Sequence, residues 1–391
     1  MIKNVHQNKL LCVIAITFLF SCIMMPVQAH AAKKRMLWSS YDVGASGYIQ
    51  ASSIADALMK KYGTKVRLLP SGTSVGRLMP VITGQVDCGF LANEIHCAIN
   101  GIYEFSTAEW GPQELRVVLA HPESVALMAT KDSGVKTVWD IKGKRMAVTT
   151  SATNIIKREG YLAFANMTWN DVIRLDMPTY GEQCNSLKEG RADVTSASLT
   201  SSYAYDLENH PKGLQVVEMY PPDDKEAIAR MQEVTPFMSI GFETKGAGVN
   251  TGKDKGGVWV PFYRYPMVTV RTDANADEVY ELIKMLDETY DMYKDAYAPN
   301  ESWAIQQSGI PPADAPYHEG AIRYLKEKGV WKAEHDAWNN QMIAHMKKVQ
   351  SLWNEFQEKV DNMSADEKKK LKGDGFAKEW LSFREQGLKK K

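Results

Sequence analysis

The sequence predicts an α/β fold of two similar lobes, each a mostly parallel sheet flanked by helices. Two observations indicate this fold class. The segments that begin at Lys34 and Lys144 both contain a short apolar run that ends in hydroxyl residues, followed by a helix-forming stretch. Further along, Gly84–Asp87 and Gly190–Asp193 share a Gly-x-x-Asp pattern at nearly the same offset. Strands that alternate with helices in this way are typical of parallel sheets.

The elements of the first lobe follow in order. The strand that starts at Lys34 leads to a predicted helix over Ile49–Met59, and a strand over Val66–Leu69 leads to a helix over Arg77–Ile82. In both copies of the Gly-x-x-Asp pattern, we expect a helix to end at the glycine, which can adopt the left-handed cap conformation. A new strand then begins just after the aspartate.

The chain beyond the second lobe changes character. Residues 211–257 are rich in Pro, Gly and charge and predict loops around a few short elements. Val258–Val270 is strand-like, and Asp277–Tyr297 is an amphipathic helix. Trp338–Met363 predicts a second long amphipathic helix, whose apolar stripe needs a partner. That partner is either the chain's own lobes, a second copy or another protein.

The N-terminus has the features of an export signal. Lys3 and Lys9 precede the apolar run Leu10–Met25, and small residues at Ala29 and Ala31 provide a cleavage site. The apolar run is shorter than the roughly 20 residues that span a bilayer core, so a membrane helix is the weaker alternative. A further alternative is a lipoprotein acylated at Cys22.

The composition supports an ordinary globular protein after cleavage. Of all residues, 44% are apolar and 24% are charged, and the 47 basic residues balance the 47 acidic ones. This balance argues against nucleic acid as a partner. The cysteines left after cleavage are Cys88, Cys97 and Cys184, so at most one disulfide forms, and free buried cysteines are the simpler expectation. We expect a signal peptide over residues 1–31, a first lobe of 32–122 with 262–330, a second lobe of 123–261, and a helical C-terminal extension of 331–391.

The first candidate site is Gly72–Gly76, which matches the G-x-S-x-G nucleophile elbow at a strand-to-helix turn. A hydrolase would also need a base and an oxyanion hole, and no supporting pattern accompanies the histidines. A hydroxyl and free backbone N–H groups at a helix N-terminus would equally bind an anion. Arg77, three residues after Ser74, could bind a ligand carboxylate with two hydrogen bonds.

Other polar loops follow the predicted strands. Asp42–Tyr48 and Thr149–Asn154 both lead into helices, and the second loop carries more polar side chains than capping requires. Ligands of open α/β sheets bind beyond the carboxyl ends of the strands, so these loops should face one cleft. No metal-binding or nucleotide-binding motif appears. The candidate ligand-binding residues are Ser46, Gly47, Tyr48, Ser74, Arg77, Asn93, Ser151, Thr153, Asn154 and Ser198; Tyr41, Tyr180 and Tyr203 could wall the pocket.

With these residues described, the chain resembles the TAXI family of solute-binding proteins, which serve TRAP transporters. The resemblance spans nearly all of residues 34–331. It rests on the loop and helix of Asp42–Leu58, on Ser71–Ser74 leading to Gly84–Asp87, on Asp140–Val148, and most specifically on the closing segment Pro316–Tyr324. Within that segment, the resemblance makes His318 a structural residue, which weakens the hydrolase hypothesis.

The resemblance implies a two-lobed, type II-like periplasmic-binding-protein fold and a periplasmic receptor that closes over a small organic anion. The ligand would be an amino acid, a dicarboxylate or an aromatic carboxylate, delivered by a monomer to TRAP membrane subunits without a metal, cofactor or catalysis. Arg77 stands where the family commonly has an asparagine, so the ligand could differ from the family's glutamate-like ligands. The alternatives are a secreted serine hydrolase that uses Ser74 and a ligand-binding input to a sensor receptor.

Overall fold

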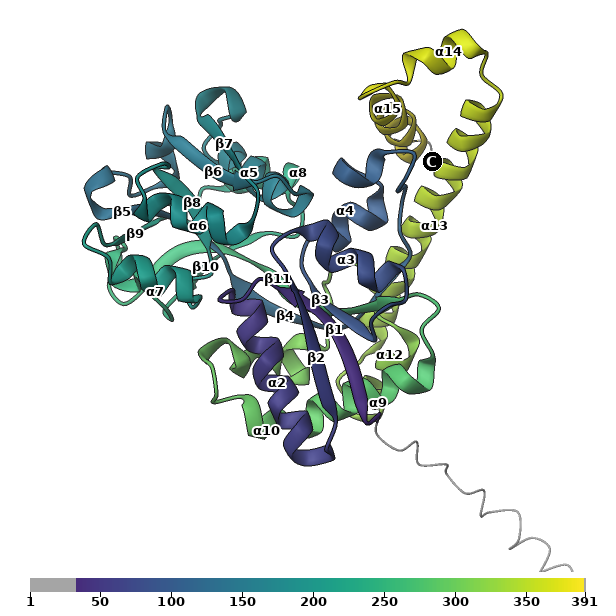
Figure 1. The fold of residues 1–391 in the computed structure, drawn as a ribbon, viewed down its shortest axis with the longest axis horizontal. Helices are drawn as coiled ribbons and strands as arrows, with labels where there is room; N and C mark the ends of the chain where they lie inside the picture. Colours follow the sequence, from purple (N-terminus) through teal and green to yellow (C-terminus); the bar gives the residue numbers. More distant parts are fainter. Residues whose placement is uncertain (1–32, 390–391) are drawn as a thin grey trace, which may run out of the picture. The chain divides into compact units, whose positions relative to one another are not determined.

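Two sheets organise the protein. The computed structural model describes residues 33–389, and the predicted signal peptide with Cys22 lies outside them. The first sheet has the order β10-β11-β3-β1-β2, with β4 paired to β11 (Figure 1). Its strands are β1 (Arg35–Tyr41), β2 (Lys65–Ser71), β3 (Cys88–Leu91), β4 (Leu115–Ser124), β10 (Ser239–Glu243) and β11 (Val258–Arg271). Helices α2 (Ser46–Tyr62), α3 (Ser74–Ile82), α4 (Glu94–Asn100), α9 (Ala276–Glu288), α10 (Tyr290–Tyr293), α11 (Ile305–Ser308) and α12 (Glu319–Glu327) accompany it.

The second sheet repeats this plan on a smaller scale, in the order β7-β6-β8-β5-β9. The chain leaves the first sheet at the end of β4 and enters the second with β5, one residue later. The strands are β5 (Ala126–Thr130), β6 (Arg145–Thr149), β7 (Ile173–Met177), β8 (Val194–Ala197) and β9 (Leu214–Val217). The helices are α5 (Ala152–Phe164), α6 (Tyr180–Lys188), α7 (Ser202–Glu208) and α8 (Lys225–Val234).

The two-lobed α/β fold is confirmed, but each sheet is mixed rather than mostly parallel. β1 pairs in parallel with β2 and β3, and β6 pairs in parallel with β7 and β8. In contrast, β11 runs antiparallel to β3, β4 and β10, and β5 runs antiparallel to β8 and β9. Each sheet therefore combines parallel strands joined by crossover helices with antiparallel neighbours, which need no such helix.

The internal repeat has a clear structural cause. The Asp87 carboxylate accepts a hydrogen bond from the Leu37 amide at 2.7 Å, and Asp193 accepts one from the Arg145 amide at 2.8 Å. In each copy, an aspartate just before one strand therefore fastens the start of its parallel neighbour. Gly84 and Gly190 have φ values of 69° and 72°, as the predicted left-handed caps require.

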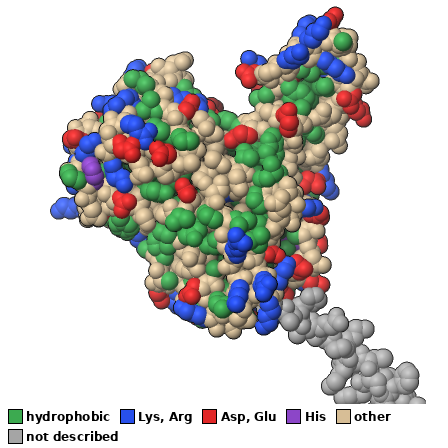
Figure 2. All heavy atoms as spheres, in the orientation of Figure 1, with side chains coloured by type: hydrophobic (Ala, Val, Ile, Leu, Met, Phe, Trp, Pro, Cys, Tyr) green, Lys and Arg blue, Asp and Glu red, His purple; other side chains and the backbone are tan. Residues whose placement is uncertain are grey.

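The C-terminal extension is a helical hairpin. It contains α13 (Ala333–Asp361), α14 (Ala365–Lys370) and α15 (Gly375–Lys389). Trp353 and Phe356 of α13 pack against Trp380 of α15, whose indole N–H donates to the Gly101 carbonyl beside α4. The apolar stripe is therefore covered in part by the extension's own last helix. Lysine side chains gather at the α14 end (Figure 2).

Two further sequence-based expectations can be compared with the described residues. Cys88, Cys97 and Cys184 are all buried and free. Among residues 33–389, no helix has the length and apolar character needed to cross a membrane.

Candidate ligand-binding site

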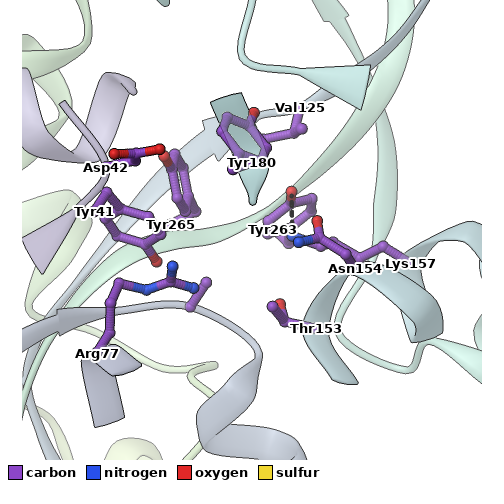
Figure 3. A pocket seen from close by; sticks show the side chains of 11 residues that line it. Tyr41, Asp42, Arg77, Val125, Thr153, Asn154, Lys157, Tyr180, Tyr263 and Tyr265 are labelled. Atoms are coloured by element: carbon purple, nitrogen blue, oxygen red, sulfur yellow. Dashed lines mark hydrogen bonds between the residues drawn. The ribbon is translucent and has the colours of Figure 1, made fainter. Parts of the chain in front are cut away.

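A pocket walled largely by tyrosines lies where the elements of both sheets meet; we call it the tyrosine pocket (Figure 3). Its space measures about 450 Å³, including the solvent at its mouth. Side chains reach it from the ends of β1 and α3, from α5 and α6, and from the long strand β11. It is lined by Tyr41, Asp42, Arg77, Ala92, Val125, Thr153, Asn154, Lys157, Tyr180, Tyr263 and Tyr265.

Three of the candidate residues, Arg77, Thr153 and Asn154, line this pocket, as do Tyr41 and Tyr180. Around it, the Tyr41 hydroxyl and Thr153 Oγ1 are buried and have no hydrogen-bond partner among the described residues. Ser74 Oγ, at the start of α3, is in the same condition. Buried polar atoms without partners cost free energy, and a polar ligand is one way of supplying those partners.

Arg77 is less available to a ligand carboxylate than the sequence analysis predicted, because protein groups already bind its guanidinium. Its Nε donates to Glu94 Oε1 at 3.1 Å, and its Nη1 donates to the Ser71 carbonyl at 3.3 Å. The guanidinium also lies over the Tyr41 ring, 4.2 Å from the ring centroid. Because the Glu94 carboxylate already neutralises this charge, Arg77 orients the wall of the pocket and has limited capacity left for a ligand.

The cationic groups that sequence reasoning missed lie on α5. The Lys157 ammonium is buried and donates to the Tyr263 hydroxyl at 3.2 Å (Figure 3). Burial lowers the pKa of Lys157 to about 7, because the interior penalises its charged form. No carboxylate forms a salt bridge with it within residues 33–389.

Arg158, the next residue of α5, is fully buried. None of its three guanidinium nitrogens has a hydrogen-bond partner in the described chain. Burial lowers its pKa, and Tyr180 and Tyr263 of the tyrosine pocket are near enough to influence it. A buried guanidinium without an anion is costly, so this arrangement favours an anionic ligand.

Two other candidates, Ser46 and Ser198, bind a protein carboxylate instead of lining the tyrosine pocket. Ser46 Oγ donates to Glu123 Oε1 at 2.7 Å, and Ser198 Oγ donates to the same oxygen. Thr200 Oγ1 and Gln50 Nε2 complete this set of donors, at 3.3 Å and 2.6 Å. We call these residues the Glu123 cluster. Burial raises the pKa of Glu123 to about 7, although the four donors oppose that rise.

The remaining candidates serve the surrounding structure. The Gly47 amide donates to the Tyr265 hydroxyl at 3.1 Å, and a Cβ at this position would lie 2.4 Å from the Tyr41 ring. Asn93 donates to Asp314 Oδ2 at 2.7 Å, and Ser151 Oγ accepts from Asn154 at 3.2 Å. Tyr48 lines none of the hollows described here and stays partly exposed.

No histidine that the structure describes forms a hydrogen bond with Ser74. His121 contacts the carbonyls of Tyr265 and Pro299 at 2.8 and 2.7 Å, and His318 caps α12 by accepting from the Gly320 amide. The expectation that His318 is structural is therefore confirmed. Within residues 33–389, no histidine is therefore placed to act as the base for a Ser74 nucleophile.

The comparison with protein families decides the relationship. The family model described as the NMT1-like family matches residues 43–329, which is most of the chain. The chain belongs to the NMT1-like family. This family corresponds to the TAXI-family solute-binding proteins of TRAP transporters, so the predicted family is confirmed.

Similar solved structures include two binding proteins. One is the alkanesulfonate-binding protein SsuA from Xanthomonas axonopodis pv. citri bound to MOPS, with 14% identity, a TM-score of 0.44, and coverage of 76% of this chain and 84% of that one. Another is the amino acid ABC transporter substrate-binding protein AbpA from Streptococcus pneumoniae bound to L-arginine. It has 13% identity, a TM-score of 0.40, and coverage of 69% and 92%. The family assignment rests on the match over residues 43–329 alone.

Proposed function

We propose that the protein is a periplasmic receptor that binds a small organic anion in the tyrosine pocket and delivers it to the membrane subunits of a TRAP transporter. The observation that carries this proposal is the pair of buried cations on α5, Lys157 and Arg158, neither of which has a carboxylate partner in the described chain. The family relationship supports the transport role.

The origin of the lining residues supports binding by lobe closure. Tyr41 and Arg77 belong to elements of the first sheet, whereas Thr153, Asn154 and Lys157 belong to α5 of the second. A ligand that bonds to both sets stabilises the closed arrangement and not an open one, so binding would shift the protein toward closure.

The charges define the ligand class within this proposal. Lys157 lines the pocket and favours a carboxylate, and Arg158, the next residue of α5, adds a buried positive charge although it does not line the pocket. The four tyrosine rings favour an apolar or aromatic body beside the carboxylate. Asp42 also lines the pocket and could accept a hydrogen bond from the amino group of an amino acid. Amino acids, dicarboxylates and aromatic carboxylates are therefore the classes to screen.

A thermal-shift screen of residues 32–391 tests the proposal. A ligand at 100 times its Kd should stabilise the folded state by about 2.7 kcal/mol, which would raise Tm by roughly 3 °C or more. The Lys157→Met variant should lose this shift. Lys136→Met, an exposed lysine of the same lobe, should keep it. An absence of stabilisation by every anion, or an equal shift in Lys157→Met, would count against the proposed site.

A further inference from the structure

A second and larger hollow lies between α4, the connection from α8 to β10, and the C-terminal helix α13; we call it the helical groove. It measures about 1250 Å³, open solvent included. The C-terminal extension supplies one wall through Trp338, Met342 and His345. The other lining residues are His96, Asn100, Gln232, Pro236, Phe237, Met238, Ser239, Arg264, Pro312, Ala313 and Asp314.

The two histidines of the helical groove have unused hydrogen-bonding capacity. The Asn100 side-chain oxygen accepts from Arg384 at 2.7 Å and lies 2.8 Å from His345 Nε2. Because an amide oxygen only accepts, Nε2 carries the proton and a neutral His345 keeps Nδ1 as a bare acceptor. The His96 ring forms no hydrogen bond with another described residue, and burial lowers its pKa to about 4, so the neutral ring offers one N–H donor and one acceptor nitrogen.

The helical groove is bordered by charged groups of both signs, and no charge of one sign dominates its lining. Arg264 lines it, and its guanidinium donates to the carbonyls of Pro312, Ala120, Gln307 and Ile310. This fixed positive charge, together with Arg384, opposes a cation. Burial raises the pKa of Asp314 to about 7, and in its ionised form this carboxyl, which accepts from Asn93, opposes an anion. Phe237, Trp338 and Met342 provide apolar surface.

The helical groove and the tyrosine pocket meet where Phe237, which lines the groove, packs against Tyr263, which lines the pocket. The Phe237 ring lies 5.3 Å from the His96 ring on one side and 6.3 Å from the Tyr263 ring on the other. Tyr263 is the residue whose hydroxyl accepts from Lys157. Asp314 and Asn93 form a second connection, because Asn93 follows Ala92 of the tyrosine pocket.

We propose that the helical groove is a second small-molecule site, which takes an uncharged heteroaromatic ring that carries an N–H donor. The ring packs between Phe237, Trp338 and Met342, and its N–H donates to His96 or His345. Its occupation moves Phe237 against Tyr263 and thereby changes the affinity of the tyrosine pocket for its anion. This coupling rests on the proposed function, whereas the site itself does not.

The site is tested with two probes of nearly the same shape, indole and benzofuran, which differ in the N–H group. Ligand-observed NMR with residues 32–391 should show that indole binds more tightly by about fivefold or more, because one hydrogen bond to a histidine nitrogen contributes about 1 kcal/mol. Met342→Trp, which puts a larger side chain where the ring packs, should abolish indole binding. Met292→Trp, at a methionine that is 47% exposed on α10, should not. Equal binding of the two probes, or unchanged binding to Met342→Trp, would overturn the site.

The coupling is tested separately, with a carboxylate that the thermal-shift screen identifies. Its Kd should change by about threefold or more in saturating indole, an effect within the usual range of coupling between two sites. The change should disappear in Met342→Trp, while the carboxylate still binds that variant. An unchanged Kd would overturn the coupling. A protein that binds indole but no carboxylate would instead contradict the proposed function and leave the groove as a site.

Discussion

The tyrosine pocket and the Glu123 cluster both bury charged groups between elements of the two sheets, but they differ in how many hydrogen-bond partners those groups have. The Glu123 carboxylate accepts from four side chains, two from α2 and two from the segment after β8. Lys157 has only a phenol as hydrogen-bond partner, and Arg158 has no hydrogen-bond partner among the described residues, although its guanidinium lies 5.9 Å from the centroid of the Tyr161 ring. A satisfied buried charge needs nothing further, whereas an unsatisfied one favours a ligand of opposite sign.

The comparison predicts that the largest effect on stability comes from removing the Glu123 carboxylate, whose hydrogen bonds are complete. Glu123→Ala should destabilise the protein by about 3 kcal/mol, because it leaves the buried hydroxyls of Ser46 and Ser198 and the Gln50 amide without their acceptor. Urea unfolding measures this difference. Glu243→Ala removes a partly exposed carboxylate that accepts from the Ser124 hydroxyl and from the amides of Thr244 and Lys245, and should cost less because water can replace it. An equal loss of stability in the two variants would show that the hydrogen bonds of the Glu123 cluster do not stabilise the fold.

Removal of the buried Arg158 charge, which has no hydrogen-bond partner within residues 33–389, should affect anion binding and not lower the stability of the free protein. Arg158→Met should leave the free protein as stable as the wild type or more stable, by about 1–2 kcal/mol, because a buried charge without a partner is removed. The same substitution should weaken anion binding by about 30-fold. Urea unfolding and titration calorimetry provide the two readouts. A large loss of stability without ligand would mean that Arg158 is structural.

The pH dependence of binding sharpens the role of Lys157. Its pKa is lowered to about 7 in the free protein, and an anion beside it favours the charged form. Below pH 7 the lysine is protonated before binding, so affinity should vary little with this group. Above pH 7 it must take up a proton on binding, so Kd should rise by up to about tenfold per pH unit. Calorimetry between pH 6 and 9 checks this, and Lys157→Met should flatten the profile.

The smallest expected effect concerns the hydroxyl at the start of α3. Ser74→Ala removes a buried oxygen that has no partner, so stability should change by less than about 0.5 kcal/mol. If the ligand supplies that partner, its affinity should fall by about fivefold. Ser71→Ala is the neighbouring control, since the Ser71 hydroxyl already accepts from the Thr73 amide. An affinity unchanged by Ser74→Ala would remove this residue from the proposed site.

The fold could be predicted further than the site because the repeat has a local cause. The aspartates of the two Gly-x-x-Asp patterns bond to strand amides, and their glycines adopt a conformation that few other residues adopt. Such constraints are visible in a single sequence. The antiparallel pairing was missed because β4 and β11 are apolar runs, whose partners depend on contacts far apart in the chain.

The candidate site was predicted only in part, for a different reason. Ser46 and Ser198 were chosen as polar residues after strands, but Glu123, which binds them, stands within an apolar strand. A charged residue in such a strand is the signal that could have revealed the cluster. Lys157 and Arg158 follow two isoleucines on α5, and nothing local distinguishes them from a helix's exposed lysines and arginines. Their burial arises from tertiary packing.

The measurement that tests the central claim most directly is a crystal structure of residues 32–391 with the carboxylate that stabilises them most. The account predicts that the carboxylate lies in the tyrosine pocket, with an oxygen within about 3 Å of Lys157 Nζ. Arg158 or the Ser74 and Thr153 hydroxyls would complete its hydrogen bonds. A carboxylate bound elsewhere, with Lys157 still bonded to Tyr263 alone and Arg158 still without a partner, would contradict it.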